Sequence, residues 1–253
     1  MFDSYGTVEN RRLDLMSKIL DPRTCASLEA LGVGEGWNCF ELGGGNGSMT
    51  EWLCEKVGAS GSVVSLDIEP KTLESIRAEN LTVLRGDART DEFPAGPFDL
   101  VLSRAMLHQI AEYAQDVLLK LAAAVKPGGW LFVCEPSFDL VKISQPRAWR
   151  EAWNGIIKWG LSEGVEWFMG RRLPAMVQSL GLGYPDAKTE VPNIRGTTID
   201  ATYFTLFFET IRERVVSSGF VDAATLDAAA AVLDDPERWT QCWMLTSVWI
   251  RKP

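Results

Sequence analysis

The stretch FELGGGNGS, residues 40–48, places four glycines directly after an apolar run, with Glu41 close in front of them. Glycine costs conformational entropy, so such a cluster predicts a tight turn or a ligand that approaches the backbone closely. A pyrophosphate favours backbone N–H groups with no carboxylate beside them. The charge of Glu41 therefore favours a ligand that carries an ammonium or sulfonium group.

The glycine spacing by itself discriminates weakly between these two kinds of ligand. Glycines stand at positions 43, 45 and 47, whereas Ser48 occupies the place of the last glycine in a dinucleotide-binding fingerprint. The preference for a cationic nucleoside over a dinucleotide thus rests on charge.

Two further carboxylates follow apolar segments. Asp67 ends SVVSLD, where a carboxylate can accept hydrogen bonds from both hydroxyls of a ribose. Asp87 lies in the GDA turn after the next apolar segment and could accept a hydrogen bond from an exocyclic amine. Either residue could instead cap a helix or stabilise a turn. Together with Glu41, they predict a site for adenosine with a cationic amino-acid tail.

The segments that must position these carboxylates alternate between strand and helix. Five short apolar strands are expected at WNCFEL, SVVSLD, LTVLRGD, FDLVLSRAM and WLFVCE, with helices expected at 49–57, 70–80 and 116–125. This alternation predicts a parallel sheet covered on both faces, a Rossmann-like doubly wound α/β fold. Ligands of such sheets bind at the carboxyl ends of the strands, so the three carboxylates should share one edge.

Five successive motifs resemble those of class I S-adenosylmethionine-dependent methyltransferases: ELGGGNG, SLDIEP, RGDA, FDLVLSRAMLH and LKPGGWLFVCEPS. The flanking stretches ENRRLDLMSKILDP, GRRLPAMV, LDDPERW and VWIRKP are more loosely similar to small-molecule methyltransferases of bacterial secondary metabolism. The resemblance implies a mostly parallel seven-stranded sheet that binds S-adenosylmethionine and yields S-adenosylhomocysteine. Gly44 departs from the common pattern, which has a residue with a side chain there.

The resemblance also implies a set of cofactor-binding residues. The methionine half would contact Glu41, Gly43, Gly45 and Asn46. Asp67 would hold the ribose with Ile68 against the adenine, while Asp87 and the backbone of Ala88 would bind the adenine edge. Ser103 would face the amino group through its backbone. Arg12 and Tyr5 are candidates for the methionine carboxylate and a lid, or are surface residues.

The remaining segments are expected to surround the acceptor. Residues 1–34 are predicted to form a helical N-terminal arm or lid, broken at DPRT with Thr24 as a new cap. Residues 35–253 would form the methyltransferase domain, in which 137–187 and 197–235 add a helical cap after the fifth strand. An apolar substrate pocket is predicted from Trp149, Trp153, Tyr203 and Phe207. These aromatic residues could equally pack the cap against the core or form a subunit interface.

Two residues, one just beyond the fourth strand and one at the end of the fifth, are catalytic candidates. His108 is the only histidine, and imidazole is suited to act as a general base near neutral pH. Glu135 would point toward the acceptor and orient the substrate. Either could be purely structural, because positioning alone can supply about 7–11 kcal/mol and a base is then unnecessary.

Composition excludes several partners. The net charge of −9 disfavours nucleic acid, and SRAM stands where base-amino methyltransferases carry [DNS]PP[YFW]. The literal Tyr184-to-Lys188 match to a dehydrogenase motif contains a proline and is attributed to chance. No apolar run is long enough for a membrane span and no signal core is present, so a cytoplasmic protein is expected. The five scattered cysteines are expected to be reduced, and no metal site is predicted.

We therefore predict an S-adenosylmethionine-dependent methyltransferase that modifies an O, C or N atom of a small hydrophobic metabolite. An aromatic, terpenoid or polyketide-like compound of secondary metabolism is expected. Apolar faces on the arm and C-terminal helices would suit a homodimer. The alternative is a cyclase or isomerase of the same fold that uses the cofactor or the pocket without net methyl transfer. A third interpretation is a homologue that binds without turnover.

Overall fold

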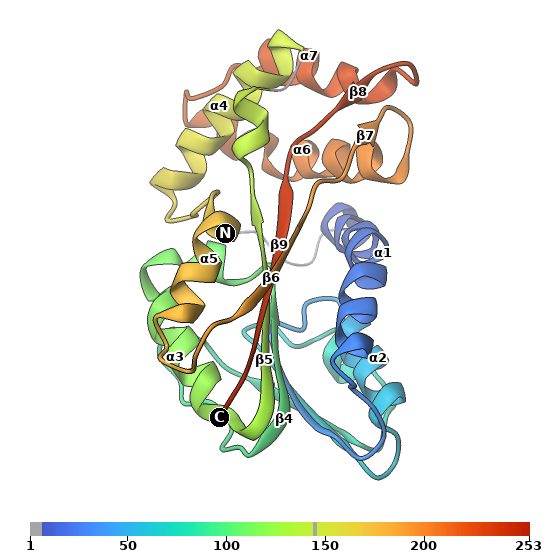
Figure 1. Ribbon diagram of the computed structural model, residues 1–253. Helices are drawn as coiled ribbons and strands as arrows, with labels where there is room; N and C mark the ends of the chain where they lie inside the picture. The colour runs from blue at the N-terminus through green and yellow to red at the C-terminus, as the bar shows by residue number, and fades with distance from the viewer. Residues whose placement is uncertain (1–6, 144–145) are drawn as a thin grey trace.

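A twisted seven-stranded sheet forms the centre of the protein, whose computed structural model describes residues 7–143 and 146–253 (Figure 1). The strand order is β3-β2-β1-β4-β5-β9-β6. The strands are β1 (Asn38–Leu42), β2 (Ser62–Asp67), β3 (Leu81–Arg85), β4 (Phe98–Arg104), β5 (Val125–Ser137), β9 (Met244–Arg251) and β6 (Asp186–Glu190). Strands β1 to β5 pair in parallel, and β9 runs antiparallel to both neighbours. The predicted Rossmann-like, mostly parallel seven-stranded fold is confirmed.

The strand order reverses between β1 and β4, which defines where a ligand can bind. Leu42 at the end of β1 pairs with Leu66 of β2 on one side and with Ser103 of β4 on the other. The carboxyl ends of three neighbouring strands therefore lie level with each other. In an open α/β sheet, the crevice at this switch point is the usual ligand site.

Helices cover both faces of the sheet (Figure 1). The C-terminal half of α1 (Thr7–Ala30) and α2 (Ser48–Val57) bury Leu28 and Leu53 against one face. On the other face lie α3 (Ala114–Ala124) and α5 (Met169–Gln178), which bury Leu118 and Leu173. The expected cap range 137–187 was therefore too broad, because the apolar side of α5 packs on the sheet.

The cap is a separate layer beyond the carboxyl end of β5 and the amino end of β9 (Figure 1). It contains η3 (Asp139–Lys142), α4 (Arg147–Ser162), α6 (Ile199–Ser217), α7 (Ala223–Asp234) and the ribbon of β7 (Ile194–Arg195) with β8 (Trp239–Thr240). One cluster of buried aromatic and aliphatic side chains from α4, α6 and α7 forms its core. Ile19 and Leu20 of α1 join this cluster.

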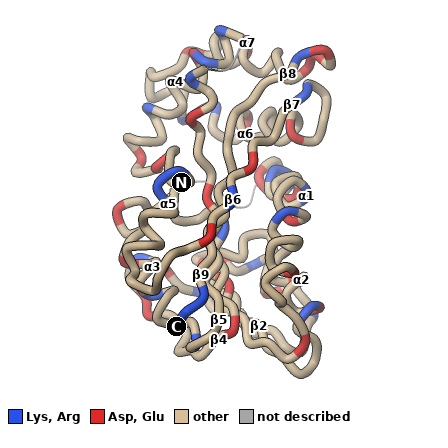
Figure 2. The backbone as a smooth tube through the Cα atoms, in the orientation of Figure 1, with Lys and Arg blue, Asp and Glu red and all other residues tan. Residues whose placement is uncertain are grey.

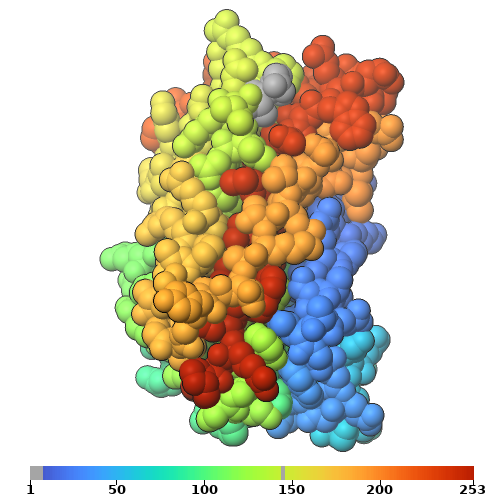
Figure 3. Space-filling model, viewed as in Figure 1, coloured from blue at the N-terminus to red at the C-terminus, as the bar shows by residue number. Residues whose placement is uncertain are grey.

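Helix α1 is continuous through Pro22, so the predicted break at DPRT is wrong. Thr24 does not cap a new helix, because its hydroxyl donates to the Leu20 carbonyl at 3.2 Å within the same helix. A proline removes one helical hydrogen bond. Burial of Leu20 in the cap and of Leu28 on the sheet holds the helix together on both sides of Pro22. In Figure 3, α1 is one continuous blue ridge along the molecule.

One other local prediction is wrong. Residues 70–80 contain only the short 3-10 helix η1 (Leu73–Ser75) in place of a full helix. The 3-10 helix η2 (Leu107–Tyr113) follows β4 and carries the only histidine into the switch-point crevice.

Candidate cofactor and active site

The glycine loop after β1 needs glycine for conformation and for space. The φ angles of Gly43, Gly45 and Gly47 are 81°, 58° and 86°, in the left-handed region that other residues avoid. A Cβ on Gly44 would lie 2.5 Å from Ser65 Oγ, so the loop rests directly on β2. A Cβ on Gly45 would meet nothing within 4 Å, so this side of the loop is open.

Glu41 lies buried beneath this loop and is 4% exposed. Its Oε2 accepts hydrogen bonds from the hydroxyls of Thr50 and Ser65. Burial raises the pKa of Glu41, while the Thr50 bond and the charge of Arg104 oppose that rise. Among the described residues, Oε1 has no hydrogen-bond partner and could accept one from an ammonium group. Glu41 is thus a buried hydrogen-bond acceptor.

Asp67 connects the end of β2 to the glycine loop. Its Oδ2 accepts a hydrogen bond from the Gly45 N–H and its Oδ1 accepts one from the Glu69 N–H, both at 2.9 Å. The neighbouring Ile68 is 54% exposed, unusual for isoleucine, and offers an apolar surface at this edge. The arrangement holds a fixed carboxylate beside an exposed apolar side chain, which suits a ribose and an attached base.

Asp87 lies after β3 and is paired within the protein. Both of its oxygens accept hydrogen bonds from the Arg89 guanidinium, with the Oδ2 to Nη2 distance at 2.6 Å. This hydrogen bonding lowers the pKa of Asp87. Ala88 is half-buried next to it. A ligand amine would share Asp87 with Arg89, a partner that the sequence analysis did not identify.

Ser103, the penultimate residue of β4, indicates whether the crevice is suited to a polar ligand. Its side chain is completely buried, yet its Oγ has no hydrogen-bond partner in the part of the chain that the structure describes. Buried hydroxyls are normally paired, so an orphaned one at the switch point indicates a site built for a further polar group. With the spare oxygen of Glu41 and the open side of Gly45, these residues fit the amino-acid end of S-adenosylmethionine.

Asn46 is held by α1 and does not point freely into the crevice. Its Oδ1 accepts a hydrogen bond from Ser17 at 3.0 Å, and its Nδ2 donates to Asp14 at 3.2 Å. Ser48 also donates to Ser17, at 2.9 Å. The side chain of Asn46 therefore anchors the arm to the glycine loop, and its predicted contact with the cofactor stays a prediction.

The two predicted arm residues differ in position. Tyr5 lies outside the described residues. The guanidinium of Arg12 is buried and donates two hydrogen bonds to Glu9, at 2.7 and 2.8 Å, and one to the Tyr203 hydroxyl at 3.1 Å. Arg12 thus joins the arm to α6 of the cap. The geometry gives no support to its predicted contact with the cofactor carboxylate.

The carboxylate of Glu135 organises the turn that carries His108. It is fully buried and accepts hydrogen bonds from three successive backbone N–H groups, those of Met106, Leu107 and His108, at 2.8–3.2 Å. It also contacts His108 Nδ1 at 2.7 Å. A carboxylate only accepts, so Nδ1 carries the proton in this contact, and in the neutral ring Nε2 has the free lone pair. Among the described residues, Nε2 has no hydrogen-bond partner.

The four predicted substrate residues lie within the core of the cap. Trp149 and Trp153 are 0% exposed, and Tyr203 and Phe207 are each 5% exposed. The Trp153 ring is stacked against Phe138 and Phe207, with centroids 5.0 and 5.5 Å away. In this conformation these rings pack against one another, so substrate contact would require the cap to rearrange. Their substrate role stays a prediction.

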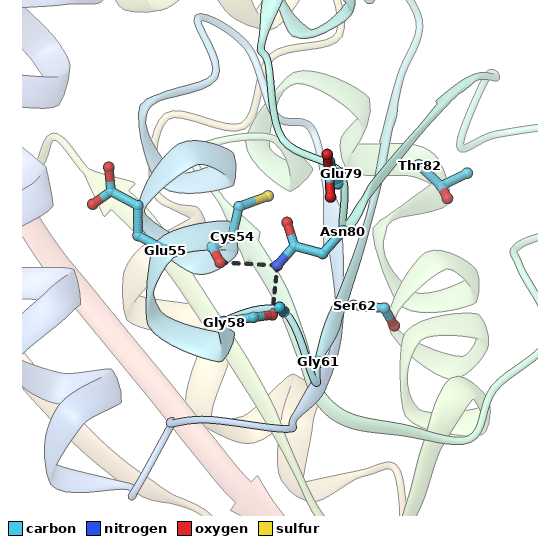
Figure 4. Close-up of a pocket in the computed structure, with 9 residues that line it drawn as sticks. Cys54, Glu55, Gly58, Gly61, Ser62, Glu79, Asn80 and Thr82 are labelled. Carbon is cyan, nitrogen blue, oxygen red and sulfur yellow. Dashed lines mark hydrogen bonds between the residues drawn. The ribbon is translucent and has the colours of Figure 1, made fainter.

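A hollow of about 620 Å³ lies at the opposite end of the sheet and does not belong to this site (Figure 4). Its walls come from the C-terminus of α2 and the amino ends of β2 and β3, with Asn80 between them. Asn80 Nδ2 donates to the carbonyls of Cys54 and Gly58, both at 2.9 Å. These bonds give Asn80 a structural role, since they satisfy the last carbonyls of α2.

Within the described ranges, no group of three or more His, Cys, Asp or Glu side chains could hold a metal ion. The same part of the chain has no helix with the length and apolarity that a membrane span requires. Acidic and basic positions are interspersed along α1 (Figure 2).

The sheet order, the glycine loop and the strand-end carboxylates define the class I methyltransferase fold. Residues 40–133 match the family described as Methyltransferase domain. Residues 40–133 thus resemble a methyltransferase domain, in agreement with the class I S-adenosylmethionine-dependent family and the cofactor predicted from the sequence.

Known proteins extend this similarity beyond the domain. The chain is 29% identical over 238 residues to an uncharacterized 37.1 kDa protein in transposon TN4556 of Streptomyces fradiae, covering 88% of this chain and 66% of that protein. It is 31% identical over 117 residues to the ubiquinone/menaquinone biosynthesis C-methyltransferase UbiE of Ectopseudomonas mendocina, covering 43% and 45%. The chain thus spans less than two thirds of either relative.

A solved structure with the same fold is phosphoethanolamine N-methyltransferase 2 of Haemonchus contortus, in complex with phosphomonomethylethanolamine and S-adenosylhomocysteine. The TM-score is 0.58 at 16% identity, over 92% of this chain and 52% of that one. At this identity the similarity concerns the fold alone.

Proposed function

We propose that this protein transfers the methyl group of S-adenosylmethionine to a small hydrophobic metabolite. The observation that carries the proposal is the linked set of Glu41, Asp67 and the open glycine loop at the switch point, inside a methyltransferase domain. The relative from Ectopseudomonas mendocina is named for ubiquinone and menaquinone biosynthesis, which supports an apolar ring compound as the acceptor.

In this proposal the chain's own residues hold the cofactor by complementary groups. The amino group is bound by Glu41 Oε1 and by the Ser103 region. Asp67 accepts hydrogen bonds from the ribose hydroxyls. Ile68 packs on the adenine, whose polar edge is bound by Asp87 and Ala88. When bound, the cofactor supplies an electrophilic methyl group on a positively charged sulfur. A dry, preorganised site then needs only to align the acceptor with that methyl group.

His108 is proposed to remove the acceptor's proton through Nε2. The Glu135 carboxylate holds Nδ1 and the backbone of the same turn, so the imidazole keeps one tautomer and one orientation. This arrangement favours an acidic hydroxyl or an activated carbon as the acceptor, because both lose a proton during methylation. A nitrogen acceptor with a free lone pair would use the site without needing the base.

The test is to incubate the protein with S-adenosylmethionine labelled in its methyl group and a panel of phenols, hydroquinones and terpenoid alcohols. Calorimetry measures binding of the cofactor, and mass spectrometry measures the products. A labelled product heavier by one methyl group is expected. An unlabelled product of unchanged mass would instead support a cyclase or isomerase. A protein that binds NAD(H) but no S-adenosylmethionine would contradict the proposal.

A further inference from the structure

A cationic side chain at the switch point has been assigned no contact with a ligand above. Arg104 is the last residue of β4 and follows Ser103 directly. Its side chain is only 11% exposed. The turn that begins after it approaches the glycine loop closely, because a Cβ on Gly43 would lie 3.1 Å from Met106 Cγ. A nearly buried cation therefore stands at the edge where the glycine loop, β4 and α1 meet.

The hydrogen-bonding capacity of Arg104 is largely unused. Its Nη1 donates to Thr24 Oγ1 at 3.2 Å, and its Nη2 lies 2.7 Å from Asp21 Oδ1. That second contact is an ion pair without hydrogen-bond geometry, since Asp21 Oδ1 is buried and has no hydrogen-bond partner within residues 7–143 and 146–253. A guanidinium has five N–H donors, so several are left without a directed acceptor among the described residues.

Arg104 is also paired electrostatically with the cofactor-binding acid Glu41. Its charge favours the ionised carboxylate of Glu41 and opposes the effect of burial on the pKa. A carboxylate beneath the glycine loop and a guanidinium at the end of β4 thus provide one negative and one positive group at the same edge. The amino-acid tail of S-adenosylmethionine carries the opposite pair, an ammonium and a carboxylate.

Two other cationic side chains lie nearby, but each is less suited to bind the carboxylate of the cofactor's amino-acid tail. Arg12 is bound to Glu9 and to Tyr203 on the cap. Lys18 lines the crevice between α1 and the glycine loop, with Asn46 and Ser48, but it is exposed to solvent. A planar guanidinium can hold a carboxylate through two parallel bonds, whereas an ammonium acts as a point charge.

We propose that Arg104 binds the methionine carboxylate of the cofactor, using donors that Asp21 and Thr24 do not satisfy. This inference rests on the proposed use of S-adenosylmethionine. Asp21 is then a competing partner, which neutralises Arg104 when the carboxylate is not there. The assignment predicts that Arg104 distinguishes ligands by their carboxylate and is indifferent to the rest of the nucleoside.

The experiment compares two ligands by calorimetry: S-adenosylhomocysteine and its decarboxylated analogue, which retains the amine, ribose and adenine. The wild type should prefer S-adenosylhomocysteine. Arg104→Met should weaken binding of S-adenosylhomocysteine by about ten- to a hundredfold, the range expected for a bond between charged groups, and leave the analogue unchanged. Lys18→Met and Arg12→Met should retain the wild-type preference.

Asp21→Asn supplies an independent test that leaves Arg104 intact. Removal of the competing charge should tighten binding of S-adenosylhomocysteine severalfold without changing the affinity for the analogue. Equal weakening of both ligands by Arg104→Met, together with no effect of Asp21→Asn, would reduce Arg104 to a structural ion pair. Loss of the preference in Lys18→Met would assign the carboxylate to Lys18. A wild type that binds neither nucleoside would instead contradict the proposed function itself.

Discussion

The imidazole of His108 and the buried carboxylate of Glu135 form a pair, with 2.7 Å between Nδ1 and Oε2, across the ends of β4 and β5. The same carboxylate accepts hydrogen bonds from the backbone N–H groups on both sides of Leu107 and from Leu107 itself. Glu135 therefore fixes both the ring and the turn that carries it. The imidazole is thereby held in one orientation at the switch point.

Replacement of His108 tests its role as a base. His108→Gln should lower kcat by about 10²–10⁴-fold on a hydroxyl acceptor, the usual contribution of general acid–base catalysis. The affinity for S-adenosylhomocysteine, measured by calorimetry, should remain that of the wild type. An unchanged kcat would leave His108 with a structural role only.

Replacement of Glu135 should show whether this residue orients His108 for activity or only stabilises the fold. Glu135→Ala leaves three backbone N–H groups without their acceptor, and each unsatisfied buried donor costs about 1–3 kcal/mol. The free energy of unfolding in guanidinium chloride should fall accordingly. Glu135→Gln keeps one acceptor oxygen, so it should lose more in kcat than in stability. If both variants lose stability and activity in the same proportion, Glu135 does not act through His108.

Gly44→Ala should damage the cofactor site by overpacking. The added Cβ would lie 2.5 Å from Ser65 Oγ and 2.9 Å from the Leu73 methyl groups. Ser65 also donates to Glu41, so its displacement disturbs the buried carboxylate. Overpacking of this kind costs about 1–3 kcal/mol, and affinity for S-adenosylhomocysteine should drop about tenfold or more. Gly34→Ala, where the new Cβ has an ordinary contact of 3.6 Å, is the matched control.

The buried position of Glu41 predicts a pH-dependent stability. Burial raises its pKa above the ordinary value of 4.5, so the folded protein binds this proton more tightly than the unfolded chain does. The resulting stabilisation is complete below about pH 4.5 and is lost as the pH rises through the folded-state pKa. Relative to Glu41→Gln, the ligand-free wild type should thus lose stability from acidic toward neutral pH.

Thermal unfolding of both proteins across this pH range measures the effect. Glu41→Gln should also lose most of the increase in Tm that S-adenosylhomocysteine gives the wild type. A constant difference in stability at every pH would show that Glu41 has the same affinity for protons in both states.

Trp153→Ala tests whether the aromatic cluster is a core or a pocket. The side chain is 0% exposed and stacked between Phe138 and Phe207, so its removal should cost about 3–5 kcal/mol of stability. Trp153→Phe should cost less and retain the affinity for substrate. A Trp153→Ala protein with wild-type stability and a raised KM would instead place Trp153 at the substrate.

The sheet and its ligand-binding edge could be predicted from the sequence because their signals are local. Short apolar strands before glycine or aspartate fix both the strand ends and the residues that follow them. The same local patterns could not show that Glu135 binds His108, since the partners lie 27 positions apart. The available signal was that two titratable residues, His108 and Glu135, lie near the ends of neighbouring strands. The distance between them depends on the turn that follows β4, which the sequence pattern does not define.

Other features depended on tertiary packing. Pro22 predicted a helix end, yet the burial of Leu20 and Leu28 against two different cores keeps α1 intact. The tryptophans of α4 suggested a substrate pocket, because composition cannot distinguish a pocket from a core. Arg104 was considered only as part of SRAM, as evidence against another motif, and its burial beside Asp21 emerged from the fold.

The continuity of α1 has a kinetic consequence. The helix, about 36 Å long at 1.5 Å per residue, bonds to the cap through Arg12, to β4 through Asp21 and to the glycine loop through Ser17. A rigid rod with three attachment points cannot release one of them without shifting the other two. Movement of the cap away from Arg12 should therefore be coupled in time to movement of the glycine loop.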